Sequence, residues 1–96
     1  MSTRQDLEDL LPASAKEITG LKIENTDLSE LILNDVTFTN CDFSGCDLSG
    51  ASLEDAAFIS CKAYGATFKN THADDVKFRN CNLALTDWDG ARLSSA

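Results

Sequence analysis

The residue types in this chain that could catalyse a reaction are a serine, a histidine and an aspartate. His72 is the only histidine, with Ser52 twenty positions before it and Asp74 two positions after it. In a hydrolase triad the histidine takes the proton of the serine, and the carboxylate orients the histidine. A triad also requires a cleft and hydrogen-bond donors for the oxyanion. The fold that carries these residues therefore decides whether they could act together.

The other reactive side chains are the cysteines Cys41, Cys46, Cys61 and Cys81. Their spacing lacks the paired CxxC or Cys/His pattern that is typical of zinc sites. The sequence also lacks a glycine-rich loop that could bind phosphate. It therefore predicts no metal site and no cofactor.

An apolar residue returns at every fifth position from residue 23 to residue 93, a period that neither an α-helix nor an ordinary β-strand has. A second series, mostly of small residues, stands two positions before the first and runs from Leu21 to Ala91. The other three positions of each unit are mainly polar residues or glycine, which tolerate solvent and tight turns. Each unit is thus predicted to turn two side chains inward and three outward. The first series is Ile23, Leu28, Leu33, Phe38, Phe43, Leu48, Leu53, Phe58, Ala63, Phe68, Ala73, Phe78, Leu83, Trp88 and Leu93.

Residues 41–55 form three consecutive units that read CDFSG, CDLSG and ASLED. They resemble the A/C-(D/N)-(L/F)-x-x signature of the pentapeptide-repeat family, and the repeat covers about three quarters of the chain. The resemblance implies an all-β solenoid: a right-handed quadrilateral β-helix of about four coils, in which four units make one square coil of 20 residues.

The residue sizes in the third coil fit this geometry. Ala63 and Ala73 fall on opposite walls, while Phe68 and Phe78 occupy the other two. Two large residues thus fill the space that two small ones leave, as close packing requires. The cysteines are predicted to be reduced packing residues on the inward small positions. Because Ser52 and His72 would project from a flat or convex wall without a cleft, the chain is predicted not to be an enzyme.

Residues 1–20 differ from the repeat and are predicted to form a helical cap on the β-helix of residues 21–96. Ser2 and Gln5 resemble a capping box, and Pro12 would end the helix. The first coil of a solenoid exposes apolar interior and unpaired backbone, so a cap is needed there. The apolar stripe at helical spacing consists of Leu7, Leu10 and Leu11.

The opposite end has no such cover in the sequence. An open apolar end favours association, so two chains are predicted to meet end to end as a homodimer, unless the chain is a fragment of a longer protein. The interface residues predicted for this end are Leu83, Leu85, Trp88 and Leu93.

The formal net charge of −8 argues against direct binding to nucleic acid or to an anionic membrane. The sequence shows neither a signal peptide nor an apolar run long enough for a membrane helix, which favours a cytoplasmic protein.

The acidic residues gather on two adjoining walls of the predicted tube. Wall one comprises residues 21–25 and their copies every 20 residues; walls two, three and four begin at residues 26, 31 and 36. Walls two and three each carry five acidic residues against one basic residue, whereas wall four has two basic residues and no acid. Wall two has Asp27, Glu30, Asp47, Asp87 and Asp89, and wall three has Asp35, Glu54, Asp55, Asp74 and Asp75.

Three interpretations of these walls follow. The first is a surface that binds an unidentified protein partner. The resemblance implies a second, because quinolone-resistance members of the family are acidic dimers that mimic duplex DNA and occupy type II topoisomerases such as DNA gyrase. It also implies a third, an effector or accessory module of a secretion system. The column of Asp35, Asp55 and Asp75 leaves calcium binding open as an alternative to a solvated corner.

Overall fold

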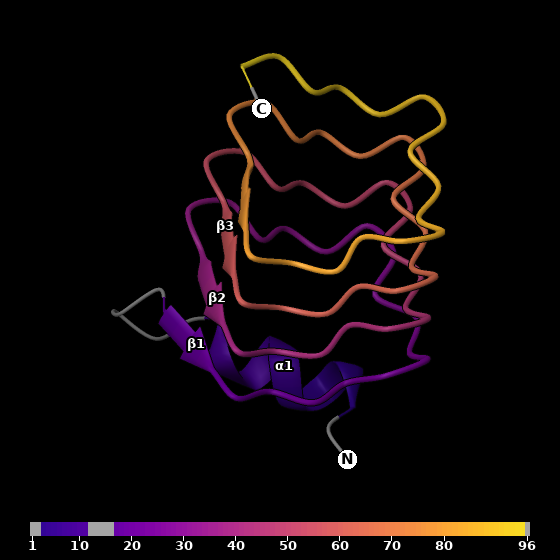
Figure 1. The fold of residues 1–96 in the computed structure, drawn as a ribbon. Helices are drawn as coiled ribbons and strands as arrows, with labels where there is room; N and C mark the ends of the chain where they lie inside the picture. The colour runs from indigo at the N-terminus through magenta and orange to yellow at the C-terminus, as the bar shows by residue number, and fades with distance from the viewer. Residues whose placement is uncertain (1–2, 12–16, 96) are drawn as a thin grey trace.

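The computed structural model describes residues 3–11 and 17–95. Its elements are helix α1 (Arg4–Leu10) and strands β1 (Glu17–Thr19), β2 (Thr37–Thr39), β3 (Ala57–Ile59) and β4 (Lys77–Arg79). The strands form one parallel sheet in the order β1-β2-β3-β4. Figure 1 shows the chain winding into coils stacked one above another, with α1 beneath the first coil and the C-terminus at the far end.

All four walls have the same register of 20 residues. Phe38 of β2 pairs with Phe58 of β3, which pairs with Phe78 of β4. On the other walls single bridges repeat the same step; for example, Asp27 pairs with Asp47. The predicted right-handed quadrilateral β-helix is therefore confirmed.

The corners of the tube depend on a left-handed backbone. Every fifth residue from Gly20 to Ser95 has a positive φ, between 53° and 75°. This region is unfavourable for most side chains and is best tolerated by Gly, Asn and Asp. The fifth position of the repeat is accordingly rich in these types, and Leu85 is the most unusual occupant.

The interior is filled by the two inward series, as predicted. Ala63 and Ala73 are buried, and Phe58 stacks on Phe78 with 4.9 Å between the ring centroids. The ring of Phe68 meets that of Phe78 edge to face at 6.3 Å. Alternation of small and large residues around one coil thus allows aromatic rings to stack from coil to coil.

All four cysteines are free thiols. The Sγ atom of Cys61 donates to the carbonyl of Phe38 at 3.3 Å, and that of Cys46 donates to the carbonyl of Ile23 at 2.9 Å. Burial raises the pKa of the Cys46 thiol. The inward cysteines therefore pack as protonated small residues that also satisfy a backbone acceptor.

Helix α1 begins at a different residue from the one predicted. Thr3 is the N-cap, and it forms a capping box with Asp6 instead of the expected pair Ser2 and Gln5. Ser2 and Pro12 lie outside the described residues. Leu7 is fully buried and belongs to the core cluster of the β-helix. The helix covers the first coil, because Arg4 also donates to the carbonyls of Asp27 and Ser29 in that coil.

The coils begin earlier than the sequence series suggested. Strand β1 lies within residues 1–20, which were predicted to form the cap, and its Ile18 pairs with Phe38. Ile18 stands five positions before Ile23, so it belongs to the apolar series that we began at residue 23. The division of the chain into a cap and a β-helix at residue 20 stays a prediction.

The far end of the tube is open in the described chain. Phe78, Leu83 and Trp88 are only partly buried, and 43% of Leu93 is exposed. The Trp88 ring stacks on Phe68 at 4.2 Å, so one face of the indole is covered from below. The last layer is thus ordered by the coil beneath it and has no described coil above it.

We predict that Gly45→Ala destabilises the fold more than Gly65→Ala. Both glycines have positive φ, near 70°, so each substitution should cost about 1 kcal/mol of backbone strain. A Cβ at Gly45 would also collide with the side chain of Asn25, whereas a Cβ at Gly65 would meet nothing within 4 Å. We expect about 1 kcal/mol of additional loss for Gly45→Ala. Urea unfolding followed by circular dichroism measures both; equal losses would contradict this account of the corner.

Candidate functional site

The ten predicted acidic residues all lie on the outside of the tube. Nine of them are exposed, and Asp74 is partly buried. Asp27 and Asp47 are paired across the first two coils of wall two, which brings two like charges to adjacent rungs of the ladder. Neighbouring rungs are about 4.8 Å apart. The structure thus brings the acids together in columns.

Several of these aspartates have a structural task that sequence reasoning missed. Oδ1 of Asp47 accepts the N–H of Ser49, two residues ahead, at 2.9 Å. Asp27 and Asp87 form the same turn with the residues two positions ahead of them. The hydroxyl and the N–H of Ser29 hold the pKa of the Asp27 carboxyl below its ordinary value. One oxygen of each carboxylate therefore closes a turn.

Asparagine forms this turn equally well. Asn82, at the corresponding position of wall one, accepts the N–H of Ala84 at 3.0 Å. The turn therefore requires an acceptor and does not require a charge. The signal in the sequence is an Asp or Asn two positions before a residue whose N–H it can reach.

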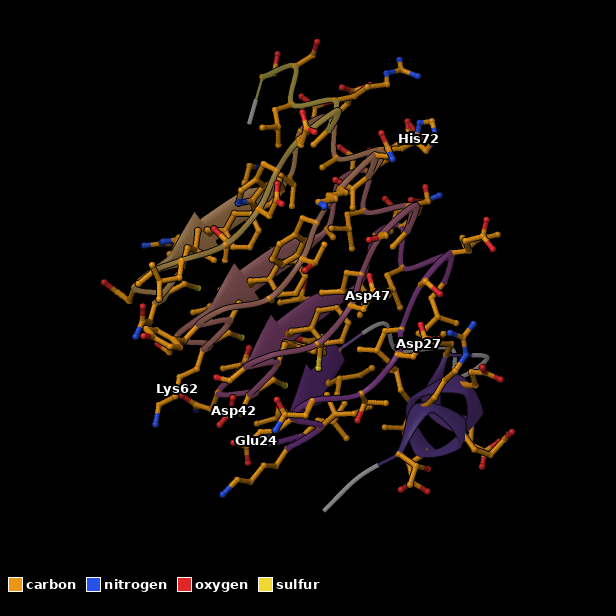
Figure 2. All side chains as sticks on the ribbon, turned by 90° about the vertical axis from the view of Figure 1, so that its right-hand side faces the viewer. Glu24, Asp27, Asp42, Asp47, Lys62 and His72 are labelled. Atoms are coloured by element: carbon orange, nitrogen blue, oxygen red, sulfur yellow. The ribbon has the colours of Figure 1, made fainter. Side chains whose placement is uncertain are left out.

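Wall one answers its charges across the coils. Its ladder places Asp42 between Lys22 and Lys62. Burial opposes ionisation of Asp42, but the hydrogen bonds from Ser44 and the charges of Lys62 and Lys22 hold the pKa of this carboxyl below its ordinary value. Figure 2 shows Glu24, Asp42 and Lys62 on one side of the tube and Asp27 and Asp47 on another, with Asp27 beside α1.

Only part of the negative charge on walls two and three is answered by cations of the same chain. Arg92 lies 3.3 Å from Asp74, Lys69 lies 3.5 Å from Asp87, and Arg4 reaches Asp27 at 3.9 Å. Within residues 3–11 and 17–95, the other seven predicted acids have no ion-pair partner within 4.0 Å. These seven are Glu30, Asp35, Asp47, Glu54, Asp55, Asp75 and Asp89.

The charge also varies along the axis of the tube. Residues 41–60 carry four acidic residues and no Lys or Arg, whereas residues 61–80 carry four Lys or Arg and two aspartates. The unanswered carboxylates are therefore concentrated in the first two coils. The prediction from wall sums alone missed this gradient, because each wall sum runs across all the coils.

The residues of the hydrolase triad are not assembled. The Ser52 hydroxyl donates to Oδ1 of Asn34 at 2.6 Å, and Nδ1 of His72 lies 3.5 Å from Nη1 of Arg92. Asp74 pairs with Arg92 and accepts the N–H of Ser94. Each candidate group is thus engaged with a neighbour outside the triad.

A hollow of about 340 Å³ lies at the corner between walls four and one. Its polar lining includes Lys22, Asn40, Asp42, Ser60 and Lys62. It is open to solvent and lies away from the acidic walls. Among the described residues, no three His, Cys, Asp or Glu side chains are arranged to hold a metal ion.

A family model for the pentapeptide repeat region matches residues 31–96. The chain belongs to the pentapeptide-repeat family. Among solved structures, it resembles full-length QnrB1, a plasmid-mediated fluoroquinolone resistance protein, with a TM-score of 0.77 and 33% sequence identity over 79% of this chain and 38% of QnrB1. A trypsin-treated form of QnrB1 gives a TM-score of 0.76 and 33% identity over 78% of this chain and 39% of that one.

The pentapeptide-repeat chain thus spans about two fifths of the length of QnrB1. A search of curated proteins found no match. No helix within the described residues is both long and apolar enough to cross a membrane.

We predict that Asp47→Ala lowers the stability of this pentapeptide-repeat protein and that Asp47→Asn does not. Alanine removes the acceptor of the Ser49 N–H, which should cost about 1 kcal/mol. Asparagine keeps the acceptor, as Asn82 does in the top coil. Chemical unfolding of the two variants beside the wild-type chain measures the difference. If Asp47→Asn is as unstable as Asp47→Ala, the carboxylate charge and not the turn stabilises this position.

Proposed function

We propose that this pentapeptide-repeat protein is a non-enzymatic binding module, and that walls two and three contact a basic surface on a protein partner. Its ligand is a macromolecule that brings cations to a regular array of carboxylates. The residues proposed for the contact are Asp27, Glu30, Asp35, Asp47, Glu54, Asp55, Asp74, Asp75, Asp87 and Asp89.

The observation that carries this proposal is the contrast between two ladders of the same tube. On wall one, Asp42 stands between two lysines and its charge is answered within the chain. On wall two, Asp27 and Asp47 stack with no cation between them. Like charges on adjacent rungs repel each other, and bound cations relieve that repulsion. A basic partner is therefore favoured on wall two and has no comparable gain on wall one.

DNA gyrase is the partner that the comparison with QnrB1 favours. The similarity to a fluoroquinolone resistance protein extends over 79% of this chain. Fluoroquinolones act on type II topoisomerases, whose DNA-binding surfaces are basic. Carboxylates repeated about every 4.8 Å along a rod can occupy such a surface in place of phosphates. Because the unanswered acids gather in the first two coils, the contact would be centred there.

We also propose that two copies associate through the open end, where Leu83, Leu85, Trp88 and Leu93 lie. The support is exposure: 75% of Leu85 and 43% of Leu93 are accessible. An apolar end of this kind gains free energy when a second copy covers it. The location proposed for the protein is the cytoplasm, where free thiols such as those of this chain persist.

We predict that the double variant Asp47→Asn/Asp55→Asn binds gyrase about tenfold more weakly than the wild-type chain, because two carboxylates that each contribute a fraction of a kcal/mol are neutralised. Asparagine keeps the turn at position 47 and suits the left-handed corner at position 55. The measurements are affinity at two salt concentrations and supercoiling by gyrase, with and without a fluoroquinolone.

The matched control is Asp42→Asn, which occupies the same position in its unit, forms the same turn and lies on neutral wall one. It should bind as the wild-type chain does. Equal loss in the control removes the assignment to walls two and three. If the wild-type chain has no effect at tens of micromolar, gyrase is not the partner, and affinity capture with mass spectrometry, compared between wild type and the double variant, then tests for another basic protein.

For the open end we predict that Leu85→Asn weakens self-association and at the same time stabilises the monomer by about 1 kcal/mol. Asparagine removes an exposed apolar side chain and fits the φ of 58° better than leucine. Sedimentation velocity and urea unfolding measure the two effects. Ile32→Asn is the control, because Ile32 is 70% exposed but lies in the first coil. A wild-type chain that stays monomeric at high micromolar concentration contradicts the proposed dimer.

A further inference from the structure

The hydrogen bonds between coils have a fixed direction. The N–H groups of Leu28 and Glu30 donate upward to the carbonyls of Asp47 and Ser49, at 2.7 and 2.9 Å. The N–H of Asp47 donates downward to the carbonyl of Thr26 at 3.0 Å. The same pattern repeats in each coil, so the lower and upper faces of a coil are different and complementary.

Arg4 satisfies the lower face of the first coil. The carbonyls of Asp27 and Ser29 occupy the positions that accept from a coil below, and Nη1 of Arg4 donates to them at 3.2 and 3.0 Å. Beside it, Leu7 is fully buried in the core cluster. Helix α1 therefore supplies the donor and the apolar contact that another coil would otherwise supply.

The upper face of the last coil has no such substitute among residues 3–11 and 17–95. The N–H groups of Leu83, Trp88 and Leu93 have no backbone acceptor there, and the carbonyls of Cys81 and Thr86 have no backbone donor. These are the groups that the lower face of a first coil complements. Apolar side chains surround them, as at the lower face.

The two faces also match in phase. The lowest strand of the tube is β1 on wall four, and the top coil is described up to Ser95 at the end of wall three. The next position on wall four lies above β4. If β1 of a second copy occupies it, Glu17 of that copy lies over Lys77, and its Thr19 lies over Arg79, in the register that β1 to β4 already follow. Opposite charges then meet at this seam.

We propose that the upper face of one copy and the lower face of another are a matched head-to-tail contact, and that docked α1 keeps this contact closed. The partner is a second copy of this chain. Because the contact is heterologous and translational, it does not close, and undocking of α1 leads to filaments. The inference goes beyond the proposed binding function and concerns surfaces other than the acidic walls.

The test undocks α1 in the full chain with Arg4→Glu/Leu7→Asp. Sedimentation velocity should shift from small species to species that grow with protein concentration, and electron microscopy should show filaments one tube wide. Adding Leu83→Asp at the upper face should reverse both effects. A double variant that keeps its far-UV circular dichroism spectrum and stays small overturns the proposal.

Cross-linking tests the register directly. Cysteines introduced by Thr19→Cys and Arg79→Cys lie three coil spacings apart within one chain, about 14 Å, which is too far for a disulfide. In the head-to-tail contact they would lie on adjacent rungs. Diamide oxidation should then give a ladder of covalent oligomers when Arg4→Gln loosens α1, and fewer when Arg4 is present.

The single-cysteine variants and the wild-type chain measure the background from the native thiols. If Arg4→Glu/Leu7→Asp loses its circular dichroism spectrum, the milder Arg4→Gln chain decides the question: no increase in cross-linking over the Arg4 chain overturns the proposal. Failure here is distinct from failure of the binding function, because the variants of walls two and three leave α1 and both end faces unchanged.

Discussion

The fold depends on one constraint, the left-handed backbone at every fifth residue. It turns the chain at each corner, so that four units bring the backbone above its own start and the coil-to-coil hydrogen bonds can form. Without the corners neither the ladder nor the inward columns would exist. The cost of positive φ explains why Gly, Asn and Asp recur at this position, and it makes Leu85, exposed and left-handed, the place where the chain departs furthest from its own rule.

Once the corners and the interior are fixed, the outward positions are free to vary, but not all of them are independent of the fold. Asp27, Asp47 and Asp87 close turns as well as carrying charge. An acidic wall on such a tube is therefore partly a by-product of turn chemistry. What turn chemistry does not explain is the absence of cations among residues 41–60, because Asn82 closes the same turn without a charge. Function is best sought in that surplus, where asparagine would have served the fold equally well.

The sequence was sufficient for the architecture because each unit repeats the same local rule and the register follows from simple counting. It predicted the inward series, the compensation between Ala63 or Ala73 and the larger Phe68 and Phe78, and the free thiols. It was wrong about the N-cap, where Thr3 replaces Ser2, because both residues are good caps and one residue of phase decides between them. Ion pairs such as Lys69 with Asp87 could not be predicted, since they depend on side-chain directions across coils that the repeat does not fix.

In a stack of equivalent coils, only the two ends distinguish one molecule from an endless tube. The interior rules favour adding another coil at either face, so a finite pentapeptide-repeat protein must interrupt its own ladder. Here the interruption at the lower face is local: one guanidinium takes the two carbonyl acceptors and one leucine fills the apolar space. At the upper face, Trp88 and Leu93 stay partly open. Because only one face is closed by the described chain itself, association is directed to the other, and the polarity of the ladder becomes a polarity of assembly.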